Sequence, residues 1–320
     1  MDKPAIQVSV CVLTCNHLRY IQRCLEGVLA QASDITMEIL IGDDCSDDGT
    51  SAIVGEIAAA HPELITHIRH DPRIGGSENY LDVLRLAKGE FIAHLDGDDY
   101  WMPGKLKQQV DYLRAHPDCA AVYANALAVT EQGEPIGLFN DAPRMRFDLA
   151  CLLRRGNFLN TSSMMFRSSL RQTILDIDGP VLDYMIHLKF ARSGFLAQLQ
   201  EPLVGYRVNS MGSMVAQEND LVRALYWEAI MNVPRELVTD DDFAHGIANF
   251  SRRVILRALR LRRWDLLRTW APRVFDASPY GRLRTLSLVA GSILRIACKA
   301  LAGRFRKDSD GRCMKIIYRY

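Results

Sequence analysis

In the first 100 residues, short apolar segments alternate with longer segments that carry apolar residues at helical spacing. We expect the short segments to be strands, at residues 8–14, 37–42, 64–69 and 91–95. We expect the segments between them to be helices, at residues 18–32, 50–60 and 77–87. Apolar strands that alternate with helices are typical of a parallel sheet covered on both faces. The sequence therefore predicts an α/β fold with a doubly wound, mainly parallel sheet.

The next part of the chain continues this pattern less regularly. Helices are expected at residues 106–115 and 181–191, strands at 120–126 and 162–166, an extended segment at 202–207, and turns at 133–143. After about residue 215 the strand signals fade and the chain reads as helical. We therefore divide the 320 residues into an α/β domain at 1–215 and a helical extension at 216–320.

The extension is strongly basic. Residues 251–320 hold 18 Lys and Arg against 4 Asp and Glu, a formal charge of +14, whereas residues 1–250 carry −13. Segments 252–263 and 283–305 interleave basic and aliphatic residues at helical spacing. Such helices bind anionic membrane surfaces. Two alternatives stay open: helices that pack on the α/β domain with their arginines in solvent, and, less favoured, binding of nucleic acid.

The cysteines, the N-terminus and the lengths of the apolar segments indicate the cellular compartment. None of the eight cysteines forms a CxxC pair, and several lie in apolar segments, which favours reduced thiols over a zinc site. The N-terminus has no basic segment followed by an apolar one, and no apolar stretch has the length of a membrane span. We expect a cytoplasmic protein, with the extension placing it peripherally on the inner face of the membrane.

An acidic cluster follows the fourth expected strand, at Asp96, Asp98 and Asp99. Neighbouring carboxylates repel one another unless a cation or hydrogen-bond donors balance them. Oxygen ligands of this kind suit Mg²⁺ or Mn²⁺, which often bind one or two carboxylates together with a diphosphate. Gly97 allows a tight turn between the acids. The alternative is a solvated acidic turn, which the following Tyr100–Trp101 pair disfavours.

A second acidic cluster, Asp43 and Asp44, follows the second expected strand. Ligands of doubly wound sheets bind at the carboxyl ends of the strands, so these acids are placed to accept a hydrogen bond from a nucleotide base. The alternative is that the nearby Asp47, Asp48 or Thr50 caps the next helix. One acid can cap while another binds a ligand.

A third acid, Asp183, precedes the apolar residues of the helix expected at 181–191. An acid at a helix start is favoured by the helix dipole and is often only a cap. The functional alternative is a general base that removes a proton from an acceptor hydroxyl.

Five segments, in order and spacing, resemble family 2 glycosyltransferases of the GT-A fold. They are residues 8–16, GDDCSDDGT at 42–50, GEFIAHLDGDDYW at 89–101, LDYMIHLKFA at 182–191 and GYRVNSMGSM at 205–214, and they span about two-thirds of the chain. The resemblance implies an inverting glycosyltransferase that uses Mn²⁺ or Mg²⁺ to move a sugar from a nucleotide-sugar donor to a carbohydrate or lipid-linked acceptor. A role in surface polysaccharide or glycolipid biosynthesis is implied as well.

The resemblance also implies residue roles. Asp98 is expected to bind the metal, with Asp96 towards the metal or the ribose, and Asp183 is expected to be the catalytic base. The expected donor-binding residues are Thr14, Asn16, Asp43, Asp44, Asn79, Asp96, Asp99 and Arg207. Arg207 is expected to contact the diphosphate, because a guanidinium binds phosphate oxygens in a bidentate manner.

The sequence departs from the family pattern at two positions. Leu182 stands where an acid usually precedes the base, and Asn209 stands where a His is common. A Gln-x-x-Arg-Trp motif is missing, which argues against a processive polysaccharide synthase. Two rivals remain: a sugar-nucleotide nucleotidyltransferase, for which Cys15-Asn16-His17 supplies no Gly-rich triphosphate loop, and an inactive nucleotide-sugar-binding module, which the retained Asp98 and Asp183 disfavour.

Overall fold

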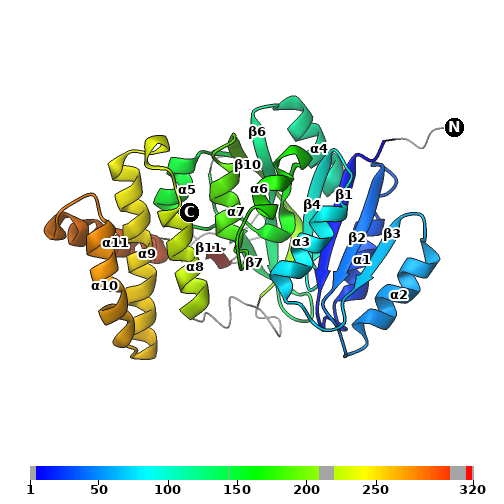
Figure 1. Ribbon diagram of the computed structural model, residues 1–320, viewed down its shortest axis with the longest axis horizontal. Coiled ribbons are helices and arrows are strands. Elements are labelled where there is room, and N and C mark those ends of the chain that lie inside the picture. The colour runs from blue at the N-terminus through cyan, green and yellow to red at the C-terminus, as the bar shows by residue number, and fades with distance from the viewer. Residues whose placement is uncertain (1–4, 144, 209–219, 303–314, 319–320) are drawn as a thin grey trace.

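The computed structural model describes residues 5–143, 145–208, 220–302 and 315–318. Asn209, one of the two departures from the family pattern, lies outside these residues. An α/β part occupies the right of Figure 1, and helices from the end of the chain occupy the left. The expected α/β fold with a helical C-terminal extension is confirmed.

The first half of the sheet is parallel, in the order β3-β2-β1-β4. Its strands are β1 (Val8–Thr14), β2 (Met37–Asp43), β3 (Ile65–Arg69) and β4 (Phe91–Asp96). The connecting helices are α1 (Ile21–Leu29), α2 (Thr50–Ala60) and α3 (Gly76–Leu86). These bounds follow the sequence expectation closely, and β1 and α2 match it residue for residue. Because the strands are parallel, the ends of β1, β2 and β4 meet at one edge of the sheet.

The second half of the sheet mixes strand directions. β9 (Met165–Arg167) is antiparallel to β4, β6 (Cys119–Val129) is antiparallel to β9, and β10 (Phe195–Arg207) is parallel to β6. The remaining strands are β5 (Tyr100–Trp101), β7 (Pro135–Asn140), β8 (Arg146–Phe147) and β11 (Lys315–Tyr318). The helices here are α4 (Lys105–Ala115), α5 (Leu149–Arg155), α6 (Arg171–Leu175), α7 (Asp183–Phe190) and the 3-10 helix η1 (Thr161–Ser163).

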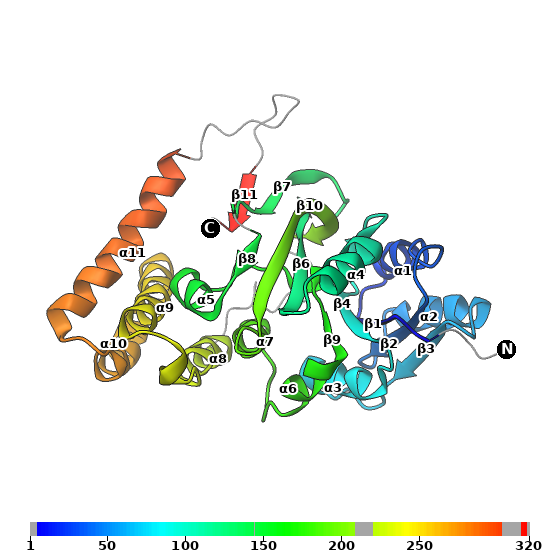
Figure 2. The same ribbon diagram turned by 90° about the horizontal axis from the view of Figure 1, so that it is seen from above.

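Two apolar cores cover the two faces of the sheet. Alternate residues of β1 point to opposite faces, so that Val10 and Val12 enter one core and Cys11 the other. Helices α1, α2 and α4 pack on the first face, and α3, α6 and α7 pack on the second. Figure 2 shows the sheet between these two layers. The second core continues without a break into the C-terminal helices through residues such as Phe243 and Trp270.

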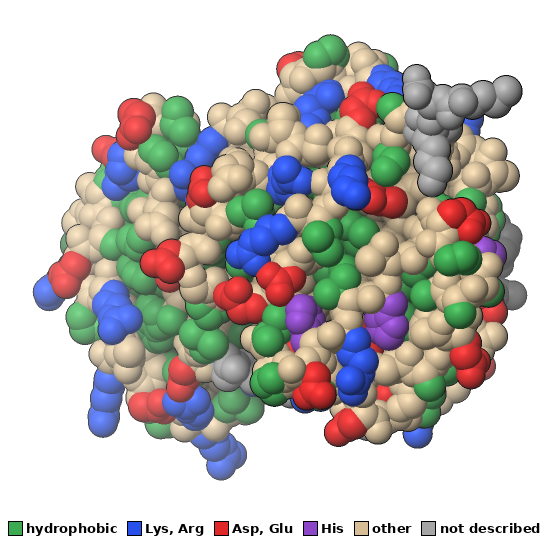
Figure 3. Space-filling view, turned by 45° about the vertical axis from the view of Figure 1, so that its right-hand side comes forward, with side chains coloured by type: hydrophobic (Ala, Val, Ile, Leu, Met, Phe, Trp, Pro, Cys, Tyr) green, Lys and Arg blue, Asp and Glu red, His purple; other side chains and the backbone are tan. Residues whose placement is uncertain are grey.

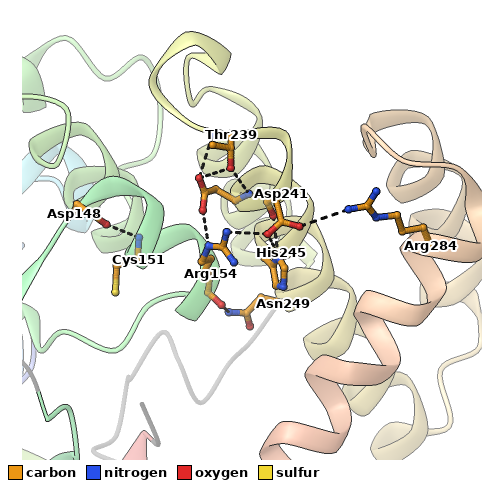
Figure 4. A network of polar contacts seen from close by, with 9 residues as sticks. Asp148, Cys151, Arg154, Thr239, Asp241, His245, Asn249 and Arg284 are labelled. Carbon is orange, nitrogen blue, oxygen red and sulfur yellow. Dashed lines mark hydrogen bonds and ion pairs between the residues drawn. The ribbon is translucent and has the colours of Figure 1, made fainter.

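The C-terminal helices are α8 (Asp220–Met231), α9 (Asp240–Leu261), α10 (Asp265–Ala277) and α11 (Arg282–Ala302). A capping box starts α9: the Thr239 hydroxyl accepts from the Asp242 N–H, and the Asp242 carboxylate accepts from the Thr239 N–H. Arg154 of α5 donates to Asp242 and, at 2.8 Å, to Asp241. Asp241 also faces Arg284 of α11, with 4.0 Å between the charged groups (Figure 4). These contacts tie the extension to the α/β part.

Three segments differ from the sequence expectation. The segment 133–143, expected to be turns, contains β7, and the strand expected at 162–166 is shifted, with η1 taking its first residues. The extension is not wholly helical, since β11 pairs in parallel with β7, Lys315 opposite Gly137. Pairing between residues so distant along the chain leaves no local pattern in the sequence. β7 is a strand because it pairs with β6 and β11, and not because of its own composition.

The structure bears on two further expectations. The cysteines within the described residues, including Cys11, Cys24 and Cys119, are free, as expected, and Cys313 lies outside these residues. In the described ranges, no helix combines the length and the apolar character needed to span a bilayer.

Candidate active site

The ends of β1 and β2 are held together by short polar contacts. Asn16 follows β1 with φ 57°, a left-handed conformation that Asn tolerates better than most residues. Its backbone N–H donates to the Ser46 hydroxyl (3.0 Å), and its side-chain oxygen accepts from the Asp47 N–H (3.0 Å). Thr14, the last residue of β1, lies 3.2 Å from the His17 ring nitrogen. The expected pair Thr14 and Asn16 therefore borders the second acidic cluster.

Asp43 ends β2 and is fully buried. Its carboxylate accepts from the Ser46 N–H (3.0 Å) and the Ser51 hydroxyl, and lies 3.4 Å from the His67 ring. Burial alone raises the pKa of Asp43, but the hydrogen bonds from His67, Ser46 and Ser51 outweigh it and hold the pKa below its ordinary value. Asp43 is thus an ionised group that shapes the loop after β2.

Asp44 is also buried, and its carboxylate accepts from the backbone N–H groups of Ile74 (2.7 Å) and Gly75. These bonds fix the loop before α3. The N-cap residue of α2 is Gly49, not one of the three residues considered as caps from the sequence. Asp48, just before it, accepts from the Thr50 N–H (2.9 Å) and from the Leu18 N–H (3.0 Å), while Asp43 and Asp44 lie at the end of β2.

Asn79 and Arg207 are less open than expected. Asn79 is 1% exposed and donates to the Gly42 carbonyl (3.0 Å), under the end of β2. Arg207 is 4% exposed, and its guanidinium donates to the carbonyls of Asp98 (2.9 Å), Thr130 (3.0 Å) and Glu131 (2.6 Å). In this geometry the buried guanidinium of Arg207 stabilises the acidic turn after β4 through hydrogen bonds to backbone carbonyls. Asn79 supports β2 in the same way.

The acidic turn after β4 packs tightly on the end of β1. The Gly97 N–H donates to the Leu13 carbonyl (2.8 Å), and a Cβ at Gly97 would lie 2.9 Å from the Thr14 hydroxyl oxygen and 2.8 Å from the His17 ring. A glycine is needed here for close approach, whereas the sequence analysis attributed it to the turn itself. Tyr100 and Trp101 after the turn are buried, as expected.

The three acids of this turn have different surroundings. The Asp96 side chain is 46% exposed and accepts from the Ser162 hydroxyl (3.0 Å), with His94 at 3.1 Å on its other oxygen. Asp98 is half-buried. Asp99 is 2% exposed and accepts from the Arg207 N–H (2.8 Å). The carboxyl group of Asp96 is accessible to a ligand, and Asp99 ties the turn to β10.

The pKa values separate these acids further. For Asp96, burial raises the pKa, but the attraction of His94 and the hydrogen bonds from His94 and Ser162 outweigh burial and lower it. For Asp99, burial together with repulsion from Asp98 and Asp96 raises the pKa well above its ordinary value. The open acid is therefore held ionised, while the enclosed one is driven towards its neutral form.

Asp183 is the first residue of α7, where the helix dipole favours a carboxylate. One oxygen accepts from the Tyr184 N–H (2.7 Å). The other accepts from the Asn157 amide (2.7 Å) and faces the Thr161 hydroxyl at 3.4 Å. The Asn157 amide also reaches the Tyr226 hydroxyl of α8 (3.2 Å), and its oxygen lies 3.1 Å from the His187 ring. Asp183 is thus oriented from several elements.

The 3-10 helix η1 joins the two acidic regions. Thr161 contacts Asp183, and the next residue, Ser162, contacts Asp96 by its hydroxyl. The Trp101 indole donates to the Ser162 carbonyl (2.8 Å), which fixes this turn against the segment after the acidic cluster. Two carboxylates that lie 87 residues apart in the sequence are therefore bonded to consecutive residues of one turn.

Most of the residues that make this connection are not evident from the sequence. Asn157, Thr161 and Tyr226 were not among the candidate residues, His94 was part of a motif but had no assigned role, and Ser162 was expected in a strand. The available signal was the polar segment Asn160–Ser163, whose three hydroxyl groups, on one threonine and two serines, precede the apolar MMF segment. Nothing local pointed to Tyr226, which reaches the site from the extension.

The metal-binding expectation rests on few side chains. Within the described ranges, no group of three or more His, Cys, Asp and Glu side chains is arranged to hold a metal ion. Asp96 and Asp98 instead offer carboxylate oxygens from one turn, a hard donor set that suits Mg²⁺ or Mn²⁺ when phosphate oxygens complete the coordination. The residues present fit a metal ion shared with a diphosphate.

Comparison with known proteins agrees with this geometry. The family model of glycosyl transferase family 2 matches residues 9–173. Protein Rv1520 of Mycobacterium tuberculosis is 33% identical over 223 residues, which cover 69% of this chain and 64% of Rv1520. The chain thus matches less than two-thirds of that relative's length. A glycosyltransferase of Nostoc, alr2836, is 29% identical, and the match covers 83% of this chain and 86% of alr2836.

A further relative and two solved structures extend the comparison. TuaG of Bacillus subtilis, a putative teichuronic acid biosynthesis glycosyltransferase, is 31% identical, and the match covers 42% of this chain and 53% of TuaG. Staphylococcus aureus TarS 1–349 with UDP-GlcNAc superimposes with a TM-score of 0.64 at 19% identity, over 96% of this chain and 95% of TarS. The Pyrobaculum calidifontis mannosyltransferase with GDP-Man and Mn²⁺ has a TM-score of 0.52 at 19% identity, over 93% and 88% of the two chains. The fold is therefore GT-A, as expected.

Proposed function

Because the chain belongs to glycosyl transferase family 2, we propose that it transfers a sugar from a nucleotide-sugar donor to an acceptor hydroxyl, with inversion at the anomeric carbon. The observation that carries this proposal is the turn η1, in which Thr161 bonds Asp183 and Ser162 bonds Asp96. It brings an acid suited to metal and diphosphate and an acid suited to proton removal to neighbouring positions. An inverting transfer needs these two tasks on either side of the reacting carbon.

Asp183 acts as the base that accepts the proton of the acceptor hydroxyl. Its carboxylate accepts hydrogen bonds from Asn157, Thr161 and the Tyr184 backbone, which fix its orientation. Two carboxylate oxygens have about four lone pairs in all, so acceptor capacity remains for the hydroxyl. The oxygen then attacks the anomeric carbon from the face opposite the leaving diphosphate, and a single displacement inverts that centre.

The acids at the strand ends serve the donor. Asp96 and Asp98 would hold the divalent metal ion, and the chemistry that such an ion supplies is neutralisation of charge on the leaving diphosphate. Asp99 and Arg207 keep the turn that carries these acids in place. Thr14, Asn16, Asp43 and Asp44 border the pocket for the nucleoside, with Asn79 supporting β2.

The relatives indicate the class of substrate. UDP-GlcNAc is bound by TarS and GDP-Man by the Pyrobaculum enzyme, and TuaG is assigned to teichuronic acid biosynthesis. We therefore assign this chain a nucleoside diphosphate sugar as donor and a carbohydrate or lipid-linked acceptor of surface polysaccharide or glycolipid biosynthesis. The residues to which we assign the chemistry all lie within residues 1–215, and residues 216–320 form the basic extension.

The test is release of nucleoside diphosphate from a panel of sugar nucleotides, with Mn²⁺ and with EDTA. The parent chain is expected to release product from at least one donor only when the metal is present, and Asp98→Ala is expected to abolish this release. Asp111→Ala is the matched control, since Asp111 is an exposed acid that pairs only with Lys107 on the surface of α4. Release that survives Asp98→Ala or EDTA contradicts the proposed metal role.

The extension is assigned to an anionic membrane surface. On α11, Leu283 is 85% exposed, Leu286 52% and Leu294 64%, and these positions lie on one side of the helix. The opposite side, with Thr285 and Val289, is buried. Figure 3 shows apolar side chains among charged ones on the left-hand part of the molecule. An apolar stripe on a basic helix is the pattern of peripheral membrane helices.

Vesicle flotation tests this assignment. The parent chain is expected to float with anionic vesicles of phosphatidylglycerol and to remain unbound with neutral phosphatidylcholine. Replacing Leu283, Leu286 and Leu294 by Ser should remove the binding, whereas Leu86→Ser on α3, which removes a leucine that is 45% exposed, should not. Equal flotation of all three chains would end the assignment.

A further inference from the structure

Arg253 of α9 lies beside the acceptor side of the site. Its guanidinium donates to the Asn157 carbonyl (3.3 Å), and its central carbon lies 5.2 Å from the centre of the Tyr226 ring. The amide of the same Asn157 donates to Asp183. One residue therefore separates this arginine from the base, although the two belong to different regions of the chain.

Arg253 is part of a group of arginines between α9 and α11. Arg252 donates to the Ser292 hydroxyl (3.0 Å) and to the Asn249 side-chain oxygen. Burial, and then repulsion by Arg253 and Arg295, lowers the pKa of Arg252 to about 10. For Arg253, burial lowers the pKa, but the neighbouring Tyr226 and Tyr184 outweigh burial and raise it, so that Arg253 stays charged.

The acceptors of these arginines are uncharged. In the part of the chain that the structure describes, Arg252 and Arg253 bond to a hydroxyl, an amide oxygen and a backbone carbonyl, and no ion pair joins Arg252, Arg253 or Arg295 to a carboxylate. Arg154, on the neighbouring α5, has both Asp241 and Asp242 as partners (Figure 4). The acids of this junction thus pair with Arg154, whereas Arg253, next to Asn157, has no carboxylate partner among the described residues.

Phosphate is the anion that suits such a position. A planar guanidinium presents its N–H groups as a fork that matches phosphate oxygens, and the charge makes each bond stronger than a neutral one. In the proposed function, the donor's diphosphate binds at the acidic turn after β4, which Ser162 contacts, whereas Thr161 contacts Asp183. The unused positive charge lies on the side of the base, where the acceptor binds.

We propose that Arg253, reinforced by Arg252 and Arg295, binds a phosphate group of the acceptor next to the hydroxyl that Asp183 deprotonates. This inference rests on the proposed function, which requires an acceptor, and it names the chemical class of that acceptor. The phosphate belongs either to a lipid-linked diphosphate or to a phosphodiester polymer. In both cases the extension contributes directly to substrate choice, because Arg253, Arg252 and Arg295 all lie in it.

The experiment is calorimetric titration of the full chain with phosphate probes in EDTA, so that binding bridged by a metal ion is removed. The probes are inorganic phosphate, decyl diphosphate and a glycerol phosphate oligomer. Arg253→Gln is expected to weaken binding about tenfold or more, because it removes a charged hydrogen-bond donor. Arg253→Lys, which keeps the charge and loses the fork, should lie between. Arg268→Gln, an exposed arginine of α10, is the control with the same change in charge.

The outcomes divide cleanly. Tighter binding of decyl diphosphate identifies the lipid-linked source, and tighter binding of the oligomer identifies the polymer. Equal binding by the parent and Arg253→Gln, an undetectable affinity in the parent, or displacement of the probe by nucleoside diphosphate overturns the inference. Nucleoside diphosphate binding with Mn²⁺ is measured separately in the same preparations. If the parent chain does not bind nucleoside diphosphate, the proposed function is refuted, whereas the result with the phosphate probes still stands.

Discussion

The donor side and the acceptor side of this site are built in different ways. On the donor side, the bonds of Asp43, Asp48 and Asp96 go to residues of the α/β part, such as Ser46, Leu18 and Ser162. On the acceptor side, Asp183 depends on Asn157, and Asn157 depends on Tyr226 of α8 and Arg253 of α9. These donor-side contacts do not involve the extension, whereas the acceptor side uses it.

Among the variants that test this contrast between the two sides, the largest effect is expected where the two sides meet. Ser162→Ala removes the hydroxyl that bonds Asp96 and should weaken Mn²⁺-dependent binding of nucleoside diphosphate about tenfold or more, since a hydrogen bond to a charged group is lost. Thr161→Val, one residue earlier, removes the contact to Asp183 and should leave this binding unchanged. Calorimetry on both variants checks the pair. Equal losses would mean that η1 does not separate the sides.

A smaller effect is expected from pH on the acceptor side. Burial lowers the pKa of His187 to about 4, against the weaker attraction of Asp183. In the unfolded chain the pKa is about 6.5, so between these values the unfolded state binds the extra proton and the fold loses stability as the pH falls. From pH 7 to pH 5 this contribution is about 2 kcal/mol in the free energy of unfolding.

His187→Gln tests this contribution. Urea unfolding of the parent and the variant at pH 7 and pH 5 gives the loss of stability for each. The variant should lose about 2 kcal/mol less than the parent over this interval. Identical losses would show that His187 does not set the acid sensitivity of the acceptor side.

The smallest effect is expected at the junction between the extension and α5. Arg154→Gln breaks the contacts to Asp241 and Asp242, but its side chain is 38% exposed and solvent screens the pair. The free energy of unfolding should fall by about 1 kcal/mol, and nucleoside diphosphate binding should not change. A loss of nucleotide binding in this variant would contradict the independence of the donor side.

The same contrast decides what the sequence could predict. Residues 8–14 and 50–60 were assigned correctly because their apolar pattern is complete within each segment. Asp43, Asp96 and Asp98 could be singled out because acids directly after apolar strands are visible in the sequence. Asn157 and Tyr226 lie 69 residues apart and reach each other only in the folded chain. β11 was missed for the same reason, since its partner β7 precedes it by a large part of the chain.

The enclosed state of Arg207 was equally hidden from the sequence. An arginine after a tyrosine in the family's late segment was expected to face the diphosphate, and the structure gives its guanidinium to the carbonyls of Asp98, Thr130 and Glu131. Two of these acceptors lie in the turn after β6, whose position depends on the pairing of β6 with β10. The residue type predicted that Arg207 lies near the site, whereas the packing of the chain determines which groups its guanidinium bonds.

The central claim is that Asp183 acts on the acceptor while the acids across η1 act on the donor. The most direct measurement is donor binding and sugar transfer by Asp183→Asn, which keeps the shape of the side chain and removes its basicity. The account predicts nucleoside diphosphate binding equal to the parent's and transfer reduced about a hundredfold to ten-thousandfold. Transfer at the parent's rate, or loss of nucleotide binding with transfer, would contradict it.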